Sequence, residues 1–291
     1  MTAKQKSVNK ASFKYLISFF IILVVILTFS LLAQNNFIKT HFKNFFPPSS
    51  KIKKQAQILR PTNIRIPILL YHYVEYVKDK KDTARQDLDT TPAIFEMQIA
   101  TLKNAGFTFI LASDVADILD GKKPAPKNPI LITFDDGYAD FYTDAYPILK
   151  KYGAKATIYV VPGLINDKNY LTLKQLINLS KNENIEIGAH TISHAVLKNT
   201  TIEKVKYEVL GSKEMLEDML GIEIVSFAYP YGDFDNQAIE IVKNAGFKTA
   251  TSTILGVVVN ETNRYLLHRM RPAELTGKHL VNYLRNEDFK N

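Results

Sequence analysis

The stretch Pro129-Ile130-Leu131-Ile132-Thr133-Phe134-Asp135-Asp136-Gly137 decides how this chain is expected to fold. Its first part, from Pro129 to Phe134, is an apolar run with the length and character of a buried strand in a parallel sheet. Two carboxylates follow directly at the carboxyl end of that strand, which is where α/β folds place their chemistry. The stretch therefore predicts an α/β domain with its functional site at the carboxyl ends of the strands.

A second signal comes later in the chain, where His190-Thr191-Ile192-Ser193-His194 follows the short apolar run 185–189. The two imidazoles are spaced so that both can point to one side of a turn or helix. Two His and one Asp supply three protein ligands and leave one position for water, as in a catalytic zinc site. The other Asp of the Asp135-Asp136 pair can then act as a base toward that water.

These residues resemble the motifs of the polysaccharide deacetylases, the NodB-homology family also called carbohydrate esterase family 4. The resemblance runs from about Ile66 to the C-terminus, and in motif style it is similar to poly-N-acetylglucosamine deacetylases. It implies that Asp135 is the general base and that Asp136, His190 and His194 bind one divalent metal ion, expected to be Zn²⁺. It also implies a distorted (β/α) barrel with fewer than eight strands.

Two further segments fit the family pattern. Residues 227–232, Phe-Ala-Tyr-Pro-Tyr-Gly, match the end of the third motif, and Leu266-Leu267-His268 matches the fifth. The resemblance implies that the backbone N–H of Tyr231 helps to hold the oxyanion and that His268 is the general acid. The substrate-binding residues are expected to be Tyr229, Pro230, Tyr231 and Leu266.

The chain departs from the family pattern at two places. An Arg usually begins the third motif and holds the base, but Ala228 stands there; the Asp-rich fourth motif ends in Trp, and the chain has no Trp. An Arg from elsewhere is the economical substitute, and Arg264, Arg269 and Arg271 lie close to His268 in the sequence. We expect Arg271 to hold the base, the alternative being that this Arg faces solvent.

From Ile66 onward, short apolar runs alternate with helical patterns, as in repeated βα units. We expect strands at 67–71, 107–111, 129–134 and 156–161, and helices at 91–106, 113–119, 145–152, 202–220 and 237–245. His72 follows the first strand, so in a barrel it lies on the catalytic rim. Both an accessory role at the site and a structural role for His72 remain open.

The N-terminal part of the chain carries a separate signal. Residues 15–33 contain no charged side chain, and at about 1.5 Å per residue a helix of this length spans the ~30 Å core of a bilayer. Lysines precede the run, which favours a cytoplasmic N-terminus. We expect a cytoplasmic tail (1–14), one transmembrane helix as anchor (15–33), an extracytoplasmic stalk (34–65) and a deacetylase domain (66–291). Cleavage as a signal peptide, which would give a secreted protein, is the alternative.

Charge is distributed unevenly along the chain. The formal net charge is +8, but residues 1–74 contain 11 Lys and Arg and no acidic residue, which leaves 26 basic against 29 acidic residues after them. A basic face is what a nucleic-acid-binding domain needs, so this class of function is excluded. The chain has no Cys and therefore no disulfides, and no feature of it predicts a protein partner.

The sequence thus predicts a metal-dependent hydrolase that removes N-acetyl groups from N-acetylglucosamine-type residues of a cell-wall or extracellular polysaccharide. An O-acetyl esterase acting on xylan or another acetylated glycan would use the same residues. A non-catalytic glycan-binding module is a third hypothesis, against which the presence of Asp135 argues. Peptidoglycan, β-1,6-linked poly-N-acetylglucosamine and chitin oligomers are all open as substrates.

Overall fold

The computed structural model describes residues 63–79, 81–286 and 288. The described residues form one compact unit. The expected tail, the transmembrane segment and the stalk as far as residue 62 lie outside the described residues, and no helix within those residues could cross a membrane. Ile64 and Arg65, expected in the stalk, instead pair with Val259 and Val258. The folded domain therefore begins before Ile66.

Among the described residues, parallel strands form a nearly closed barrel, and two further short strands pair antiparallel in a separate sheet. The strands are β1 (Ile64–Arg65), β2 (Ile68–Tyr71), β3 (Thr108–Ile110), β4 (Pro129–Phe134), β5 (Ala156–Val160), β6 (Ile185–Ala189), β7 (Ser226–Ala228), β8 (Thr249–Leu255), β9 (Val258–Val259) and β10 (Leu267–Arg269). Seven of them follow one another in the order β10-β8-β7-β6-β5-β4-β2, and β3 pairs with β4 beside this path. A bridge between Leu69 and Met270 joins β2 to the end of β10, with Leu70 N donating to Met270 O at 2.9 Å. The expected (β/α) barrel is confirmed as a nearly closed ring of parallel strands; with β3 the sheet has eight strands in the described part of the chain, seven of them in the ring.

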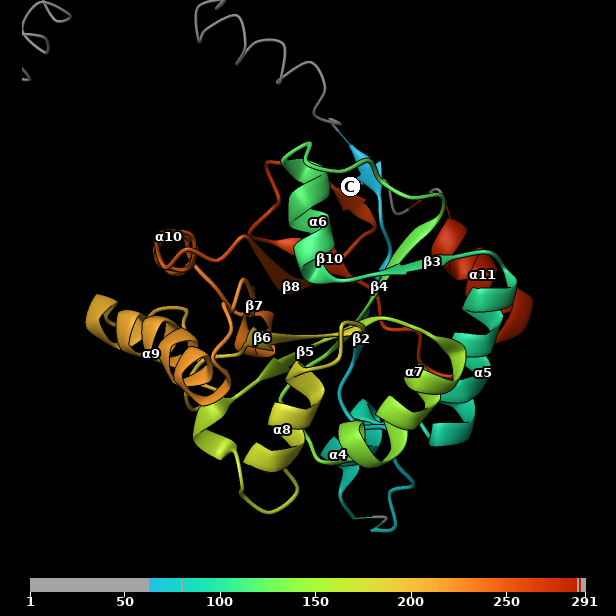
Figure 1. Cartoon of the computed structure of the whole chain (residues 1–291), viewed down its shortest axis with the longest axis horizontal. Helices are drawn as coiled ribbons and strands as arrows, with labels where there is room; N and C mark the ends of the chain where they lie inside the picture. Colours follow the sequence, from blue (N-terminus) through green and yellow to red (C-terminus); the bar gives the residue numbers. More distant parts are fainter. Residues whose placement is uncertain (1–62, 80, 287, 289–291) are drawn as a thin grey trace, which may run out of the picture. The chain divides into compact units, whose positions relative to one another are not determined.

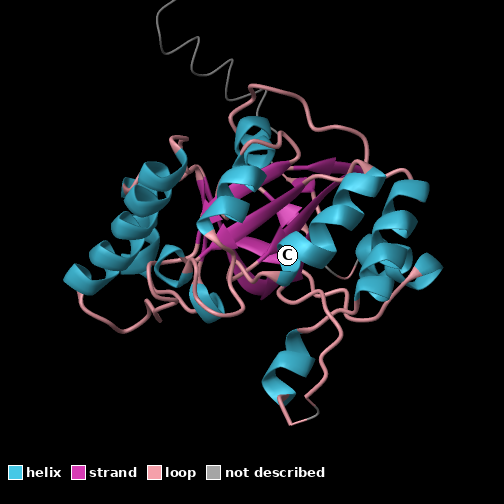
Figure 2. Ribbon diagram, turned by 60° about the horizontal axis from the view of Figure 1, so that its bottom comes forward, coloured by secondary structure: helices cyan, strands magenta, loops and turns pink. Residues whose placement is uncertain are grey.

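Helices connect the strands and cover their outer face. They are α4 (Thr83–Leu88), α5 (Pro92–Asn104), α6 (Ala112–Leu119), α7 (Tyr146–Tyr152), α8 (Leu173–Ser180), α9 (Ile202–Leu220), α10 (Asn236–Asn244) and α11 (Gly277–Arg285), with short turns η1 (Phe141–Ala145), η2 (Pro162–Leu164) and η3 (Pro230–Gly232). Figure 1 shows α5, α7 and α11 side by side on one flank and α9 and α10 on the other. The short helix α4 projects away from the sheet (Figure 2).

Local sequence explains where the long helices begin and end. Thr91 caps α5 by accepting a hydrogen bond from Ile94 N, and Pro92 occupies the first turn, where its missing N–H costs nothing. The helices α7 and α9 stop at Gly153 and Gly221, both with positive φ, as their sequences predict.

Side chains on each strand alternate between the helices outside the barrel and the barrel interior. On β2, Leu69 and Tyr71 belong to the main core formed with the surrounding helices, whereas Ile68 packs with Leu131, Leu267 and residues of α6 in a second cluster. Helix α6 therefore closes the amino-terminal end of the barrel. Above this apolar layer the interior is polar, with the buried residues Thr133, Asp135, Thr157, Ser226, Thr251 and Arg269.

Candidate active site

Asp136, His190 and His194 meet at the carboxyl end of the barrel. Asp136 follows β4, and the two histidines follow β6, so the parallel strands bring them to the same rim. Asp136 Oδ1 lies 3.2 Å from His190 Nε2 and 3.1 Å from His194 Nε2. All three potential ligand atoms lie within 4.8 Å of one another. The structure thus assembles the three residues that the sequence predicted as metal ligands.

The geometry of this cluster fits a divalent cation. Ligands bound at ~2.0–2.1 Å with tetrahedral angles lie roughly 3.3 Å apart, which is close to the separations observed here. His190 Nδ1 lies 2.7 Å from Ala228 O, which accepts its N–H, so that Nε2 is the nitrogen of a neutral His190 that can bind a cation. Asp136 Oδ1 is buried and has no hydrogen-bond donor among the described residues. A cation between these atoms would satisfy all three.

One side of the cluster is open to solvent. The His190 side chain is 1% exposed, whereas that of His194 is 25% exposed. Burial tends to raise the pKa of Asp136, but the contacts with His190 and His194 outweigh it and hold that pKa far below its usual range. The carboxylate is therefore ionised, and a fourth ligand can approach from the side of His194.

Asp135 is held by a buried arginine. Arg269 Nη1 and Nη2 donate to Asp135 Oδ1 and Oδ2, both at 2.7 Å, and Arg269 Nε donates to Ser252 O at 2.8 Å. Burial tends to raise the pKa of Asp135, but Arg269 and His190 outweigh it, and the net shift is downward. Asp135 is therefore kept ionised beside the cluster of Asp136, His190 and His194, but it is not a member of that cluster.

The prediction that Arg271 holds the base was wrong, because Arg269 takes this role. Arg271 is exposed, because β10 ends at Arg269 and the chain then leaves the barrel. Leu267 faces the interior, so the alternation of the strand directs Arg269 inward as well. Arg264 pairs instead with Asp120 at 2.5 Å. The arginine does come from the strand that carries His268, as the sequence suggested.

His268 does not reach the cluster. Leu267 packs in the inner cluster and Met270 in the outer core, so the alternation of β10 directs His268 outward. Its ring packs against Gly256, where a Cβ would not fit, and burial lowers its pKa. The expected role of general acid therefore does not fit the position of His268.

His72 lies beside Asp135 instead. The register pairs Tyr71 with Phe134, and Asp135 N donates to Tyr71 O at 3.0 Å, so the next residues, His72 and Asp135, stand opposite each other. Tyr71 and Phe134 both face the outer core, which directs His72 and Asp135 inward. Burial lowers the pKa of His72, with Arg269 and Arg271 adding to the effect, while the two carboxylates favour its protonated form. The structure thus brings His72 into the site.

Of the expected substrate-binding residues, Tyr231 lies at the mouth of the site. Its side chain is 63% exposed, and its ring centroid lies 4.5 Å from that of His194. Pro230 precedes it and is buried. Tyr229 and Leu266 pack with the outer core instead, Tyr229 against Phe227 and Phe234, so the expectation that they line the groove was wrong. The cause is again strand alternation: Phe227 and Tyr229 both face outward.

An aromatic row that was not predicted from the sequence lies beside Asp136. Tyr73 stacks on Tyr138 with ring centroids 3.9 Å apart, and Tyr138 lies 5.1 Å from Tyr170. Burial, the largest cause, raises the pKa of Tyr73 to about 12 and also raises those of Tyr138 and Tyr170, and Asp136 adds to each shift. The signal in the sequence was Tyr138 itself, which follows the Asp-Asp-Gly turn directly.

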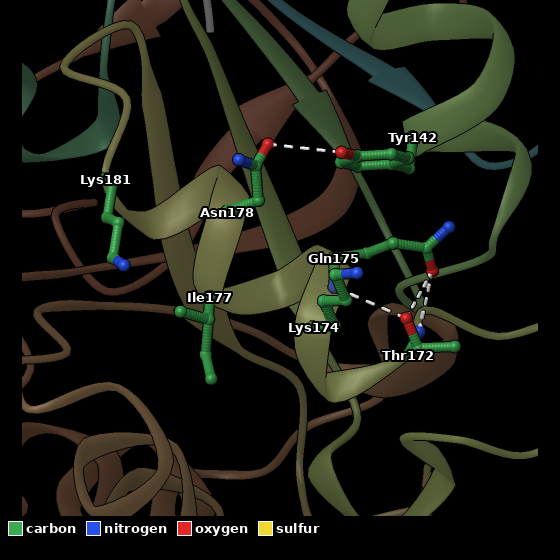
Figure 3. Close-up of a pocket in the computed structure, with 7 residues that line it drawn as sticks. All are labelled: Tyr142, Thr172, Lys174, Gln175, Ile177, Asn178 and Lys181. Atoms are coloured by element: carbon green, nitrogen blue, oxygen red, sulfur yellow. Dashed lines mark hydrogen bonds between the residues drawn. The ribbon is translucent and has the colours of Figure 1, made fainter.

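A pocket of about 550 Å³ lies apart from these residues. It is lined by residues of α8, by Thr172 and Lys181 at the two ends of that helix, and by Tyr142 of η1, whose hydroxyl donates to Asn178 at 3.2 Å (Figure 3). None of the predicted site residues lines it. It is therefore separate from the candidate active site.

Comparison with known proteins identifies the family. The family model described as "Polysaccharide deacetylase" matches residues 122–250. The Bacillus subtilis protein named "Putative polysaccharide deacetylase YxkH" is 30% identical over 207 residues, which cover 71% of each chain. The poly-β-1,6-N-acetyl-D-glucosamine N-deacetylase of Staphylococcus aureus is 26% identical over 252 residues, covering 80% of this chain and 85% of that protein.

A solved structure agrees with these relatives. The Streptococcus pyogenes deacetylase PplD, determined in complex with acetate, superposes with a TM-score of 0.71 at 30% identity, covering 77% of this chain and all of that one. Carbohydrate esterase family 4 deacetylases depend on a metal ion, and the Asp136-His190-His194 cluster is where this chain offers one a place. The chain belongs to the polysaccharide deacetylase family of hydrolases.

Proposed function

We propose that this protein removes N-acetyl groups from N-acetylglucosamine residues of a cell-wall or extracellular polysaccharide, with one divalent ion, Zn²⁺, as cofactor. The observation that carries the proposal is the pairing of Asp135 with Arg269 beside a cluster of three potential ligands with one open side. A glycan-binding module needs no buried, ionised carboxylate at this place. A hydrolase needs a base there.

Asp136, His190 and His194 would hold the ion. When bound, the ion would polarise the acetyl carbonyl and lower the pKa of a water molecule. Asp135 accepts the proton of the attacking water, and Arg269 keeps its oxygens in place. The backbone N–H of Tyr231 helps to hold the oxyanion, as the family resemblance implies. Tyr231, exposed at the mouth, offers a surface for the sugar or the acetyl methyl group.

His72 is the proton donor to the departing amine in this proposal. It faces Asp135 across β2 and β4, whereas His268 points out of the barrel. An amide leaves as an amine only when its nitrogen is protonated, so a donor is needed at the site. We expect His72→Gln to lower kcat by about 10²–10⁴-fold without loss of the ion. His268→Gln is the control and should keep kcat close to the wild-type value. If instead His268→Gln lowered kcat and His72→Gln did not, His268 would be the proton donor.

The choice of substrate rests on the relatives. The Staphylococcus aureus relative is named for poly-β-1,6-N-acetyl-D-glucosamine, and its match covers most of both chains. The uncharged run 15–33 supports a location in the cell membrane, with the catalytic domain extracytoplasmic, or secreted if the run is cleaved. In either case the enzyme would meet a polymer outside the cytoplasm.

The test is a side-by-side assay of acetate and free amine released from poly-β-1,6-N-acetylglucosamine, peptidoglycan, chitin oligomers and acetylated xylan. The proposal expects equal amounts of acetate and new amine from one of the N-acetylated polymers. Acetate without amine, released from xylan, would show an O-acetyl esterase. Release of neither product by the metal-loaded protein would favour the glycan-binding module.

A further inference from the structure

Glu208 is a buried carboxylate on α9 that the chemistry above does not use. It is 4% exposed and belongs to the stripe of buried residues with which α9 packs on the barrel, between Val205 and Ser212. A glutamate rarely occupies such a position unless its oxygens are hydrogen-bonded, because burial of an unpaired charge is strongly unfavourable. Its hydrogen-bond partners therefore indicate what it does.

All three partners of Glu208 lie in the turn between the two histidine ligands. Oε2 accepts from Ile192 N at 2.9 Å and from Ser193 N at 3.0 Å, and Oε1 accepts from Ser193 Oγ at 2.7 Å. Thr191, Ile192 and Ser193 are the residues that separate His190 from His194. The carboxylate thus binds the backbone that carries both imidazoles.

This turn is strained. Thr191 and His194 have φ values of 62° and 58°, in the left-handed region that a β-branched residue such as Thr avoids. Such a conformation is unfavourable and persists only where its surroundings hold it. Gly163 N donates to Ile192 O at 2.9 Å from the other side. The turn is therefore clamped between η2 and α9.

His194 depends on this clamp more than His190 does. The His190 ring is fixed by Ala228 O and is almost completely buried. The His194 ring is partly exposed. Within the described part of the chain it lies against Asp136, the His190 ring and the Tyr231 ring. The direction of the His194 ring is consequently set by the backbone of the turn.

We propose that Glu208 is a positioning residue of the metal centre: its carboxylate holds the 191–194 turn in the conformation that aims His194 Nε2 at Asp136 Oδ1. This inference rests on the proposed metal site. Partners that orient metal ligands typically change metal affinity by about 10–100-fold when removed. The affinity for the ion is thus the property that Glu208 should control.

The experiment compares Zn²⁺ dissociation constants, measured by competition with a chelator, for the full chain and its variants. Glu208→Ala should weaken binding by about 10–100-fold. Glu208→Gln should bind close to the wild-type value, because its amide oxygen still accepts from the two backbone N–H groups and its NH₂ donates to Ser193 Oγ. Glu217→Ala is the matched control: Glu217, also on α9, accepts from Ile224 N at 3.0 Å and pairs with Lys213, away from the turn. It should keep wild-type affinity.

Wild-type affinity in Glu208→Ala, or equal weakening in Glu217→Ala, would overturn the inference. If Glu208→Ala does not fold, Glu208→Asp replaces it: the charge remains but the carboxylate is retracted by one carbon, so binding should be weaker than in Glu208→Gln. Equal and wild-type affinities in these two variants would also overturn the inference. A wild-type protein that binds no Zn²⁺ would contradict the metal site itself, which is a different result.

Discussion

Asp135 and Asp136 are neighbours that lie at the same rim in different surroundings, and positive φ angles at Asp136 and Gly137 account for this. Side chains that follow one another on a strand point to opposite faces, so a continued β4 would direct Asp136 out of the barrel. Asp136 has a φ of 76° and Gly137 a φ of 80°, which ends the strand geometry at this point. Both carboxylates therefore lie at the rim, Asp135 against Arg269 and Asp136 against the two histidines.

The ion pair between Asp135 and Arg269 gives a prediction on stability. Arg269→Met leaves a buried carboxylate without its partner, and such a change costs about 3–5 kcal/mol. The cost should be smaller at pH 4 than at pH 7. Arg269 lowers the pKa of Asp135 in the folded protein, so the stability that it provides is present above the unfolded pKa and lost as pH falls.

Urea unfolding of the metal-free variants measures this effect. Arg271→Met is the matched control: Arg271 is exposed, and its loss should change the free energy of unfolding by no more than about 0.5 kcal/mol. Equal losses in the two variants would contradict the assignment of Arg269 as the residue that holds Asp135.

At the scale of single residues, the sequence identified the three potential metal ligands and the adjacent carboxylate but not their supporting residues. Asp136, His190 and His194 could be predicted because their residue types and spacing indicate a metal site even when the exact strand boundaries are unknown. To place Arg269 and His268, one must know which side chains of the three-residue strand β10 face the barrel interior. The sequence Leu266-Leu267-His268 does not show this. Packing of Leu267 against α6 decides that phase, and it is a contact between distant parts of the chain.

At the scale of elements, strands and helices with strong local signals were predicted well. β4 was expected at 129–134 and has those bounds, and α5 begins at the expected Thr91 cap. The helix expected from Ser113 begins at Ala112, because the Asp114 carboxylate accepts from Leu111 N and sets the first turn. Closure of the barrel between β2 and β10 is a long-range pairing that periodicity does not reveal.

The junction between β4 and η1 gives a prediction on pH dependence. Asp140 is buried, and its Oδ2 accepts from Val74 N at 2.5 Å. Burial raises the pKa of Asp140 from 3.8 to about 6. The folded protein then binds a proton near pH 5 that the unfolded chain has released, so stability is lost as pH rises through this window.

Asp140→Asn removes this titration and keeps an acceptor for Val74 N. At pH 8 the variant should be more stable than the wild type by up to about 3 kcal/mol, the equivalent of the two-unit shift, whereas near pH 4 the two should be similar. Thermal or urea unfolding at both pH values measures the difference. A variant whose advantage did not change with pH would show that Asp140 does not titrate in this way.

At the scale of the whole molecule, the start of the folded domain is testable. β1 pairs with β9, and Arg65 Nη2 donates to Leu284 O at 2.7 Å and to Asn286 O at 2.8 Å. A chain beginning at Pro61 keeps these contacts, whereas one beginning at Ile66 loses them. The shorter chain should be less stable by at least about 1.5–3 kcal/mol, the usual value of one hydrogen bond to a charged group. Equal urea midpoints would place the boundary at Ile66, as the sequence suggested.

The most direct test of the central claim is acetate release from an N-acetylated polysaccharide before chelation, after chelation and after Zn²⁺ is added back. Loss on chelation and recovery with one Zn²⁺ per chain is the predicted result. Asp136→Asn should not recover, and Asp135→Asn should bind the ion but release acetate about 10²–10⁴-fold more slowly. Undiminished acetate release by protein that elemental analysis shows to be free of metal would contradict the account.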